Sequence, residues 1–154
     1  MLHSLEGTIG IYGATLVVAA LSGFIPVINA EIYLVAVTLA MRSVPLAIVL
    51  GLIVAIGQMT AKVGIYKVSA GAARKAKTSE KIQTKLDKVH ALMAKWKDKP
   101  FVLVFVSAVV GVPPFFVVSI LAGMLKLDFK KFLVLGTIGR TLRFVTIALV
   151  ALLF

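Results

Sequence analysis

The most constraining feature of the sequence is a run of nineteen residues, 43–61, that contains no charged side chain. As a helix this run would be about 28 Å long, which matches the hydrocarbon core of a bilayer. The chain of 154 residues is also 60% hydrophobic, with a mean hydropathy of +1.06, which is well above the range of soluble domains. The run therefore predicts a transmembrane helix in an all-helical integral membrane protein.

A second uncharged run, residues 101–125, is interrupted at its centre by Gly111, Pro113 and Pro114. Proline removes a backbone donor and clashes with the preceding turn, so a straight helix is not expected here. Each eleven-residue arm would be about 16 Å long, roughly half the bilayer. This pattern predicts a re-entrant helical hairpin.

The stretch at residues 8–41 has similar interruptions, at Gly23, Pro26 and Asn29. Its arms are longer than those of residues 101–125, so both a hairpin and two tight crossings remain open. In either case the stretch begins and ends on one side of the membrane. We expect that side to be the outer one.

The basic residues are segregated along the chain, because 11 of the 17 fall between residues 62 and 99. Short loops rich in Lys and Arg stay cytoplasmic. We therefore expect an integral protein of a prokaryotic cytoplasmic membrane, with residues 62–100 inside. A hairpin at 101–125 keeps Lys126, Lys130 and Lys131 inside as well, and residues 132–154 then cross outward.

Residues 8–61 and 101–154 thus share one order, a hairpin followed by a span, in opposite orientations within a single membrane domain. An offset of 88 residues matches Gly23 with Gly111, Pro26 with Pro114, Arg42 with Lys130 and Gly51 with Gly139. Inverted repeats with broken helices are how many transporters build a site that is reachable from both faces. The sequence therefore predicts an inverted repeat.

The segment between the halves predicts a cytoplasmic amphipathic helix that ends at Asp98, before Pro100. Its apolar positions are Ile82, Leu86, Val89, Met93 and Trp96, and its basic positions include Lys81, Lys85, Lys88 and Lys95. One interpretation is a helix that lies on anionic lipid headgroups with Trp96 at the interface. The other is a helix that packs on the cytoplasmic face of the protein. Topology accounts for the basic charge, so nucleic-acid binding is not expected.

Glu31 is the only charged residue in the run 7–41. A carboxylate at such a position is costly unless it is solvated or paired, so it marks a candidate site. In a wet cavity it could exchange a proton or hold a cationic group. The alternative is that Glu31 caps the N-terminus of a half-helix.

Arg140 and Arg143 lie three residues apart and therefore share one face of the last span. Their acceptors could be Glu31, the carbonyls of a hairpin or a phosphate, which arginine binds through two hydrogen bonds. Arg140 is favoured because Gly139 beside it leaves room for close approach. The alternatives are a structural ion pair and snorkelling towards the helix end.

Enzyme chemistry is not expected from these residues. The chain has no Cys, and its two His, His3 and His90, are isolated. Neither a nucleophile with its base, nor paired catalytic carboxylates, nor a metal-ligand spacing is present. We therefore expect no cofactor and no metal.

Three short motifs make the chain resemble a small member of the DedA, or VTT-domain (SNARE-associated Golgi protein), membrane family. They are Pro-x-x-x-x-Glu at 26–31, a pattern from Gly57 through Tyr66 to Gly71, and Ala122-Gly123 before Phe132. The likeness covers roughly residues 20 to 150. It implies two opposed re-entrant hairpins and movement of phospholipids or polyprenyl-phosphate carriers between leaflets, with proton coupling as an option.

The chain also departs from the family pattern. Lys62 lies where family members commonly carry an Asp, and Val109 and Phe115 lie near the places of hairpin arginines. Of the usual acidic pair only Glu31 carries over. Arg140 and Arg143 resemble a Gly-Arg-x-x-Arg ending of small members and could replace the missing charges.

Three functions remain in competition at this point. The first is a lipid transporter or scramblase whose partners are phosphate-bearing or anionic lipids, working as a monomer or a homodimer. The second is a small proton-coupled exporter of cations or drugs that uses Glu31. The third is a membrane scaffold that transports nothing and uses its charges as internal ion pairs.

Overall fold

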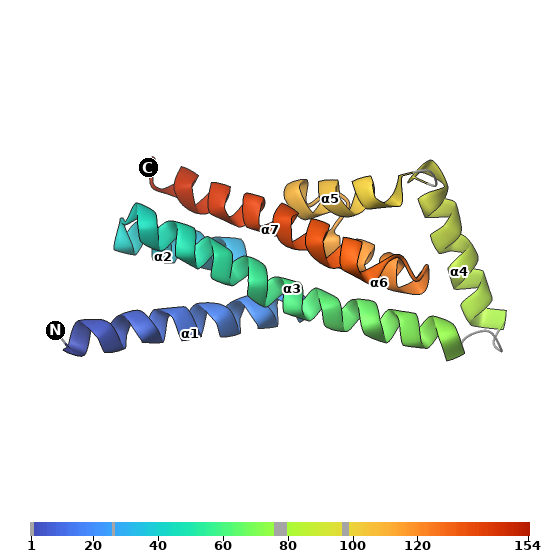
Figure 1. The fold of residues 1–154 in the computed structure, drawn as a ribbon, viewed down its shortest axis with the longest axis horizontal. Coiled ribbons are helices and arrows are strands. Elements are labelled where there is room, and N and C mark those ends of the chain that lie inside the picture. The colour runs from blue at the N-terminus through green and yellow to red at the C-terminus, as the bar shows by residue number, and fades with distance from the viewer. Residues whose placement is uncertain (1, 26, 76–79, 97–98) are drawn as a thin grey trace. The chain divides into compact units, whose positions relative to one another are not determined.

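A computed structural model describes residues 2–25, 27–75, 80–96 and 99–154, and in these segments all regular structure is helical. In chain order the helices are α1 (Leu2–Phe24), α2 (Ala30–Met41), α3 (Val44–Lys75), α4 (Glu80–Met93), the 3-10 helix η2 (Ala94–Trp96), α5 (Pro100–Val110), α6 (Phe115–Met124) and α7 (Phe129–Ala151) (Figure 1). By length and composition, α1, α3 and α7 can each cross a membrane. The predicted helical membrane protein is thus confirmed at this level.

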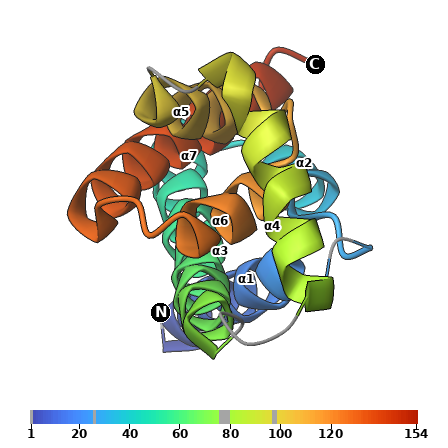
Figure 2. The same ribbon diagram turned by 90° about the vertical axis from the view of Figure 1, so that its right-hand side faces the viewer.

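The chain forms two compact units, and each is built from segments that are far apart in the sequence or from several helices. Unit 1 contains Met1–Ala61 and Arg140–Phe154, and unit 2 contains Lys62–Gly139. The boundaries between the units fall inside α3 and inside α7. Unit 1 therefore holds α1 and α2, unit 2 holds α4, η2, α5 and α6, and each unit holds a part of α3 and a part of α7 (Figures 1 and 2).

Helix α2 turns back after α1 and has a defined cap at each end (Figure 1). Asn29 is the N-cap, since its side-chain oxygen accepts from the backbone N–H groups of Glu31 and Ile32. At the other end Arg42 adopts a left-handed conformation, with φ 43°, and its N–H donates to the Thr38 carbonyl. The twelve residues of α2 span only about 18 Å, so a full second crossing by this helix is not supported.

The break between α5 and α6 lies at residues 111–114, where the sequence predicts it. Gly111 ends α5 with φ 85°, a conformation that suits glycine, and Pro114 precedes the first turn of α6. The Ser107 hydroxyl donates to the Pro113 carbonyl at 2.5 Å. This bond satisfies backbone that would otherwise be orphaned in an apolar environment.

The first break differs in detail from its prediction. Helix α1 continues to Phe24, so Gly23 lies inside α1, where a β-carbon would clash with the Ala61 side chain, and its absence lets α1 approach α3. Asn29 lies in the break and caps α2. Pro26 lies outside the described residues.

Small residues form much of the core of unit 1. A single cluster joins residues of α1, α2, α3 and α7, namely Ala19, Ala30, Leu34, Ala47, Leu50, Val54, Ala55, Phe144 and Ala148. A β-carbon placed on Gly57 would lie 2.7 Å from that of Ala19, and one on Gly51 would lie 3.0 Å from Val145. Helices in lipid pack by such close approach, because water supplies no hydrophobic drive there.

The core of unit 2 is more aromatic. The Phe132 ring stacks on Tyr66 at 5.0 Å and on Phe115 at 5.9 Å between ring centres. The Tyr66 hydroxyl donates to the Leu127 carbonyl, which attaches the α6–α7 connection to α3. Gly123 of α6 packs directly on the Tyr66 carbonyl.

Two predicted boundaries need correction. The span expected at residues 43–61 continues as α3 to Lys75, so Lys62 lies within the helix and does not mark its end. The amphipathic helix is divided into α4 and η2, and residues 76–79 and 97–98 lie outside the described residues. The side chains of Ile82, Lys85, Leu86, Val89, Met93 and Lys95 also lie outside the description.

Candidate functional site

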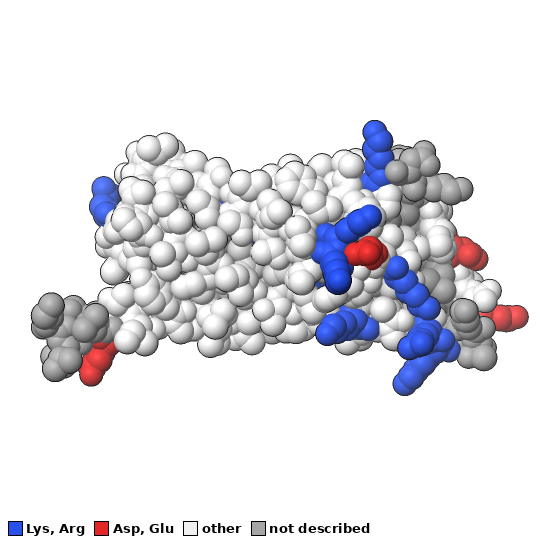
Figure 3. Space-filling model, in the orientation of Figure 1, with Lys and Arg blue, Asp and Glu red and all other residues white. Residues whose placement is uncertain are grey.

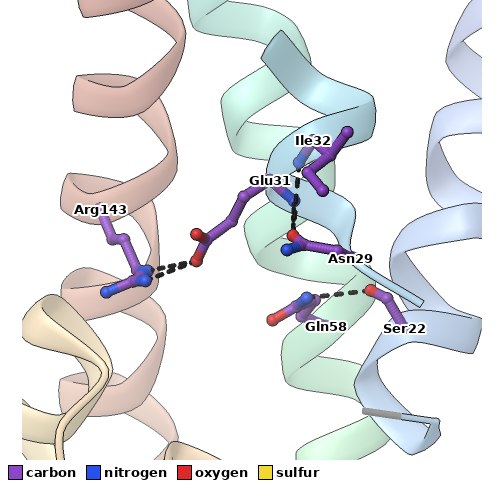
Figure 4. Close-up of polar contacts among 6 residues, drawn as sticks. All are labelled: Ser22, Asn29, Glu31, Ile32, Gln58 and Arg143. Atoms are coloured by element: carbon purple, nitrogen blue, oxygen red, sulfur yellow. Dashed lines mark hydrogen bonds and ion pairs between the residues drawn. The ribbon is translucent and has the colours of Figure 1, made fainter. Parts of the chain in front are cut away.

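Glu31 and Arg143 form an ion pair inside unit 1. Arg143 donates from Nε and from Nη2 to Oε1 of Glu31, at 2.8 and 2.5 Å (Figure 4). Hydrogen bonds between ionised groups are roughly twice as strong as neutral ones. Arg143, one of the two arginines that the sequence offers to Glu31, is thus in direct contact with it.

The start of α2 places the carboxylate for this contact. Asn29 occupies the N-cap and takes the first free N–H groups, including that of Glu31 itself at 2.9 Å. Glu31 is therefore not the cap of α2, and its side chain extends towards α7 (Figure 4). Its position in the first turn still favours a negative charge, because the helix N-terminus is partially positive.

The ion pair remains accessible. The Glu31 side chain keeps 37% of its surface exposed and the Arg143 side chain keeps 20%. Arg143 lies eight residues before the end of α7, about 12 Å along the helix, so a crossing α7 places it within the hydrocarbon core. The site thus combines two opposite charges whose side chains are partly exposed.

A buried polar contact holds the helices beside the site. Gln58 of α3 donates to the Ser22 hydroxyl of α1 at 2.9 Å, and Ser22 donates to the Ala19 carbonyl (Figure 4). The hydroxyl groups of Thr15 and Tyr33 join α1 to α2 at 3.1 Å. The sequence patterns did not predict these contacts. Gln58 was nevertheless visible as a polar amide within the uncharged run 43–61.

Arg140 is placed differently from the sequence expectation. Its side chain is buried, and its guanidinium carbon lies 5.5 Å from the centre of the Phe144 ring. Gly139 does not provide open space for a ligand, because a β-carbon there would lie 2.6 Å from that of Ala108. This glycine lets α7 pack on α5, which removes the reason for preferring Arg140 over Arg143.

Lys62 is a buried cation that the sequence analysis assigned to a cytoplasmic segment. It is 3% exposed, and its Nζ lies 5.1 Å from the centre of the Phe116 ring in unit 2. An ammonium group over an aromatic face is attracted by the ring quadrupole. The sequence feature that could have indicated this contact is the pair Phe115 and Phe116 at the start of α6.

The expected headgroup surface of the amphipathic segment is described only in part. Lys81 and Lys88 are exposed on α4, and Trp96 is half-buried in η2. Lys85 and Lys95 lie among the side chains outside the description. An interfacial role for this segment stays a prediction.

Within the described residues, no three His, Cys, Asp or Glu side chains gather in a way that could hold a metal ion. No family model, curated protein or solved structure matches the chain. The site must therefore be interpreted from its own geometry.

Proposed function

We propose that the chain is a transporter or scramblase that moves phospholipid or polyprenyl-phosphate lipid between the leaflets of a membrane. The observation that carries the proposal is the accessible ion pair between Glu31 and Arg143 in an apolar helical protein. Charges at such depth are costly, so their accessibility favours a functional site over inert packing.

The chemistry of the pair suits a phosphate. An arginine guanidinium forms two parallel bonds to phosphate as it does to carboxylate, so a lipid phosphate competes with Glu31 for Arg143. Protonation of Glu31 would remove its charge and free Arg143 for the lipid. This exchange is the basis on which we include proton coupling in the proposal.

The architecture proposed with this function is an inverted repeat of two re-entrant hairpins. In support, α5 and α6 have 11 and 10 residues, each about 16 Å long and so half a bilayer. The same length of chain separates Ala30 from Phe115 and Val44 from Phe129, the first residues of matching helices. That register is three residues shorter than the offset of 88 found from the glycines and prolines.

A matching backbone feature also supports the repeat. Arg42 after α2 and Lys126 after α6 are basic residues with left-handed backbone conformations, at φ 43° and 52°. The resemblance to the DedA and VTT-domain family points to the same architecture, and we propose membership in that family. The chain departs from that family at Lys62, which lies at the place of the family's Asp.

The test is transbilayer movement of a fluorescent phospholipid in liposomes that contain the purified protein, with dithionite added to bleach the outer leaflet. We expect bleaching beyond the outer-leaflet fraction. Glu31→Gln and Arg143→Ala should each slow it at least about tenfold, the effect of losing one interaction of about 1.4 kcal/mol. Glu6→Gln, an exposed carboxylate in the same helix pair, is the matched control and should stay within about twofold.

Bleaching that stops at the outer-leaflet fraction in tight vesicles would contradict scrambling of that lipid. The second candidate is then the scaffold, in which the ion pair is a structural contact between two partners within one unit. The double variant Glu31→Gln/Arg143→Gln separates the two functions. A scaffold keeps its stability in this variant, whereas a transporter loses activity even where stability is kept.

A further inference from the structure

Unit 2 contains an open pocket that shares no residue with the ion pair of Glu31 and Arg143. Its volume is about 420 Å³, and we call it the α3 pocket; its lining residues are Tyr66, Lys67, Ala70, Gly71, Arg74 and Lys126. Three of these six residues are cationic, and none is acidic. On the face drawn in Figure 3, basic side chains gather over the part of unit 2 where α3 ends.

The spacing along α3 explains how its side chains meet in the pocket. Lys67, Gly71 and Arg74 are separated by four and three residues, so they lie on one face of the helix. Lys67 is held at the wall, with its Nζ 5.6 Å from the centre of the Phe129 ring. Gly71 meets no atom within 4 Å of a β-carbon placed on it, so its missing side chain leaves open space and serves no close packing.

Lys126 enters the pocket from the α6–α7 connection. Its N–H donates to the Gly123 carbonyl, and the Leu127 N–H donates to the Ala122 carbonyl, both at 3.0 Å. These two bonds form a Schellman motif, in which the residue with positive φ is usually glycine. Here the residue is a lysine with φ 52°, a conformation that costs roughly 1 kcal/mol for a side chain with a β-carbon.

The helix end alone does not explain this arrangement. Arg74 lies in the last turn of α3, where a cation complements the negative end of the helix dipole. Lys126 follows the end of α6, where the same dipole effect holds, but glycine would be the unstrained residue at its left-handed position, and a residue held in an uncommon backbone conformation points to a function. The nearest acid along the connection, Asp128, is engaged at the start of α7, where it accepts from the Lys131 N–H at 2.9 Å.

We propose that the α3 pocket binds a phosphate group. Arg74 supplies a guanidinium fork, Lys67 and Lys126 supply ammonium groups from two directions, and Gly71 leaves the space that the phosphate enters. Tyr66 fixes the pocket wall, because its hydroxyl already donates to the Leu127 carbonyl. The phosphate belongs either to a lipid headgroup or to a soluble phosphate ester. This binding does not depend on whether the protein moves lipid.

The test measures binding in neutral detergent by native mass spectrometry, with dioctanoyl phosphatidic acid as the probe and dioctanoylglycerol as its phosphate-free counterpart. We expect one saturable phosphatidic acid per chain and no saturable dioctanoylglycerol. Arg74→Gln and Lys126→Gly should each weaken binding about tenfold. Lys126→Gly is chosen because glycine suits the left-handed position, so the variant should fold at least as stably as the wild type.

Two matched controls and one uncharged variant sharpen this result. Lys75→Gln and Lys130→Gln remove exposed cations next to the pocket but outside its lining, and should change binding less than twofold. Gly71→Leu changes no charge but fills the space, and should weaken binding about as much as Arg74→Gln.

Inorganic phosphate and glycerol phosphate are then added to compete with phosphatidic acid. Their effect shows whether the bound phosphate belongs to a lipid headgroup or to a soluble ester. Displacement of the lipid at similar concentrations assigns a soluble phosphate ester, and failure to displace it assigns a lipid headgroup. Equal loss in the controls Lys75→Gln and Lys130→Gln would overturn the proposal, because it would show attraction by net charge alone. Unchanged binding in Gly71→Leu and Lys126→Gly would overturn it as well.

Discussion

At the scale of single residues, the contact between Glu31 and Arg143 makes a measurable prediction for stability. Glu31→Gln and Arg143→Gln each leave one charge without its partner, so each should lower the free energy of unfolding by about 1–3 kcal/mol. The double variant should lose no more than the worse single variant. Unfolding in detergent with increasing denaturant measures all three, and the expected coupling energy is about 1–2 kcal/mol.

The matched control is the same set of variants made with Arg42 in place of Arg143. Arg42 is the residue with a left-handed backbone conformation at the end of α2. Glu31→Gln and Arg42→Gln share no contact and should have additive effects on stability. Additive effects for Glu31 and Arg143 would contradict the ion pair.

The charged residues of this site could be predicted from the sequence, but the contacts between them could not. A lone carboxylate and two arginines in apolar runs were visible, since charge in such runs is rare. Arg140 and Arg143 lie on one face of a helix, so spacing alone could not show that Arg143 donates to Glu31. That contact depends on how α7 packs on α2, which no local pattern records.

At the scale of helices, two glycines of unit 2 should respond in opposite ways to the same change. In Gly123→Ala, the added β-carbon meets the main-chain oxygen of Tyr66, which a helix holds in place. The free energy of unfolding should fall by about 1–3 kcal/mol. Gly71→Ala meets no atom and should raise it by about 0.5–1 kcal/mol, because alanine favours the helix.

Thermal unfolding of both variants in one detergent checks this prediction. Equal effects of the two substitutions would show that α6 does not pack on α3 through Gly123.

Element boundaries were predictable where proline, glycine or a capping residue acts locally. The break at 111–114 and the extents of α5 and α6 follow from Pro113, Pro114 and Gly111, which act on their own turn. The end of α3 was missed, because Lys62 was interpreted as the edge of the membrane. Contact with the Phe116 ring, fifty-four residues away in sequence, allows that lysine to be buried within the helix.

At the scale of the whole molecule, the proposed re-entrant hairpin predicts the sides on which its two ends lie. The chain has no Cys, so single cysteines can be placed without background. Lys99→Cys and Lys130→Cys flank α5 and α6 at exposed positions. Both should react with a membrane-impermeant maleimide from the cytoplasmic side, and Phe154→Cys should react from the opposite side. Labelling of the first two from opposite sides would show a full crossing.

The division of the chain into two units could not be predicted from the sequence. Apolar runs and breaks showed the number and order of the helices well enough. They carried no sign that unit 1 takes the first part of α3 and the last part of α7. Such pairing depends on contacts between residues far apart in the chain, for which a single sequence holds no periodic signal.

The composition of unit 1 also bears on how the protein is made. Glu31 and Arg143 are separated by 112 residues, so translation at about 5–20 residues per second leaves the carboxylate waiting roughly 6–22 s for its arginine. During that interval the carboxylate of Glu31 lacks its Arg143 partner, so water or another polar group must solvate it. The ion pair that joins α2 to α7 therefore forms only after α7 has left the ribosome.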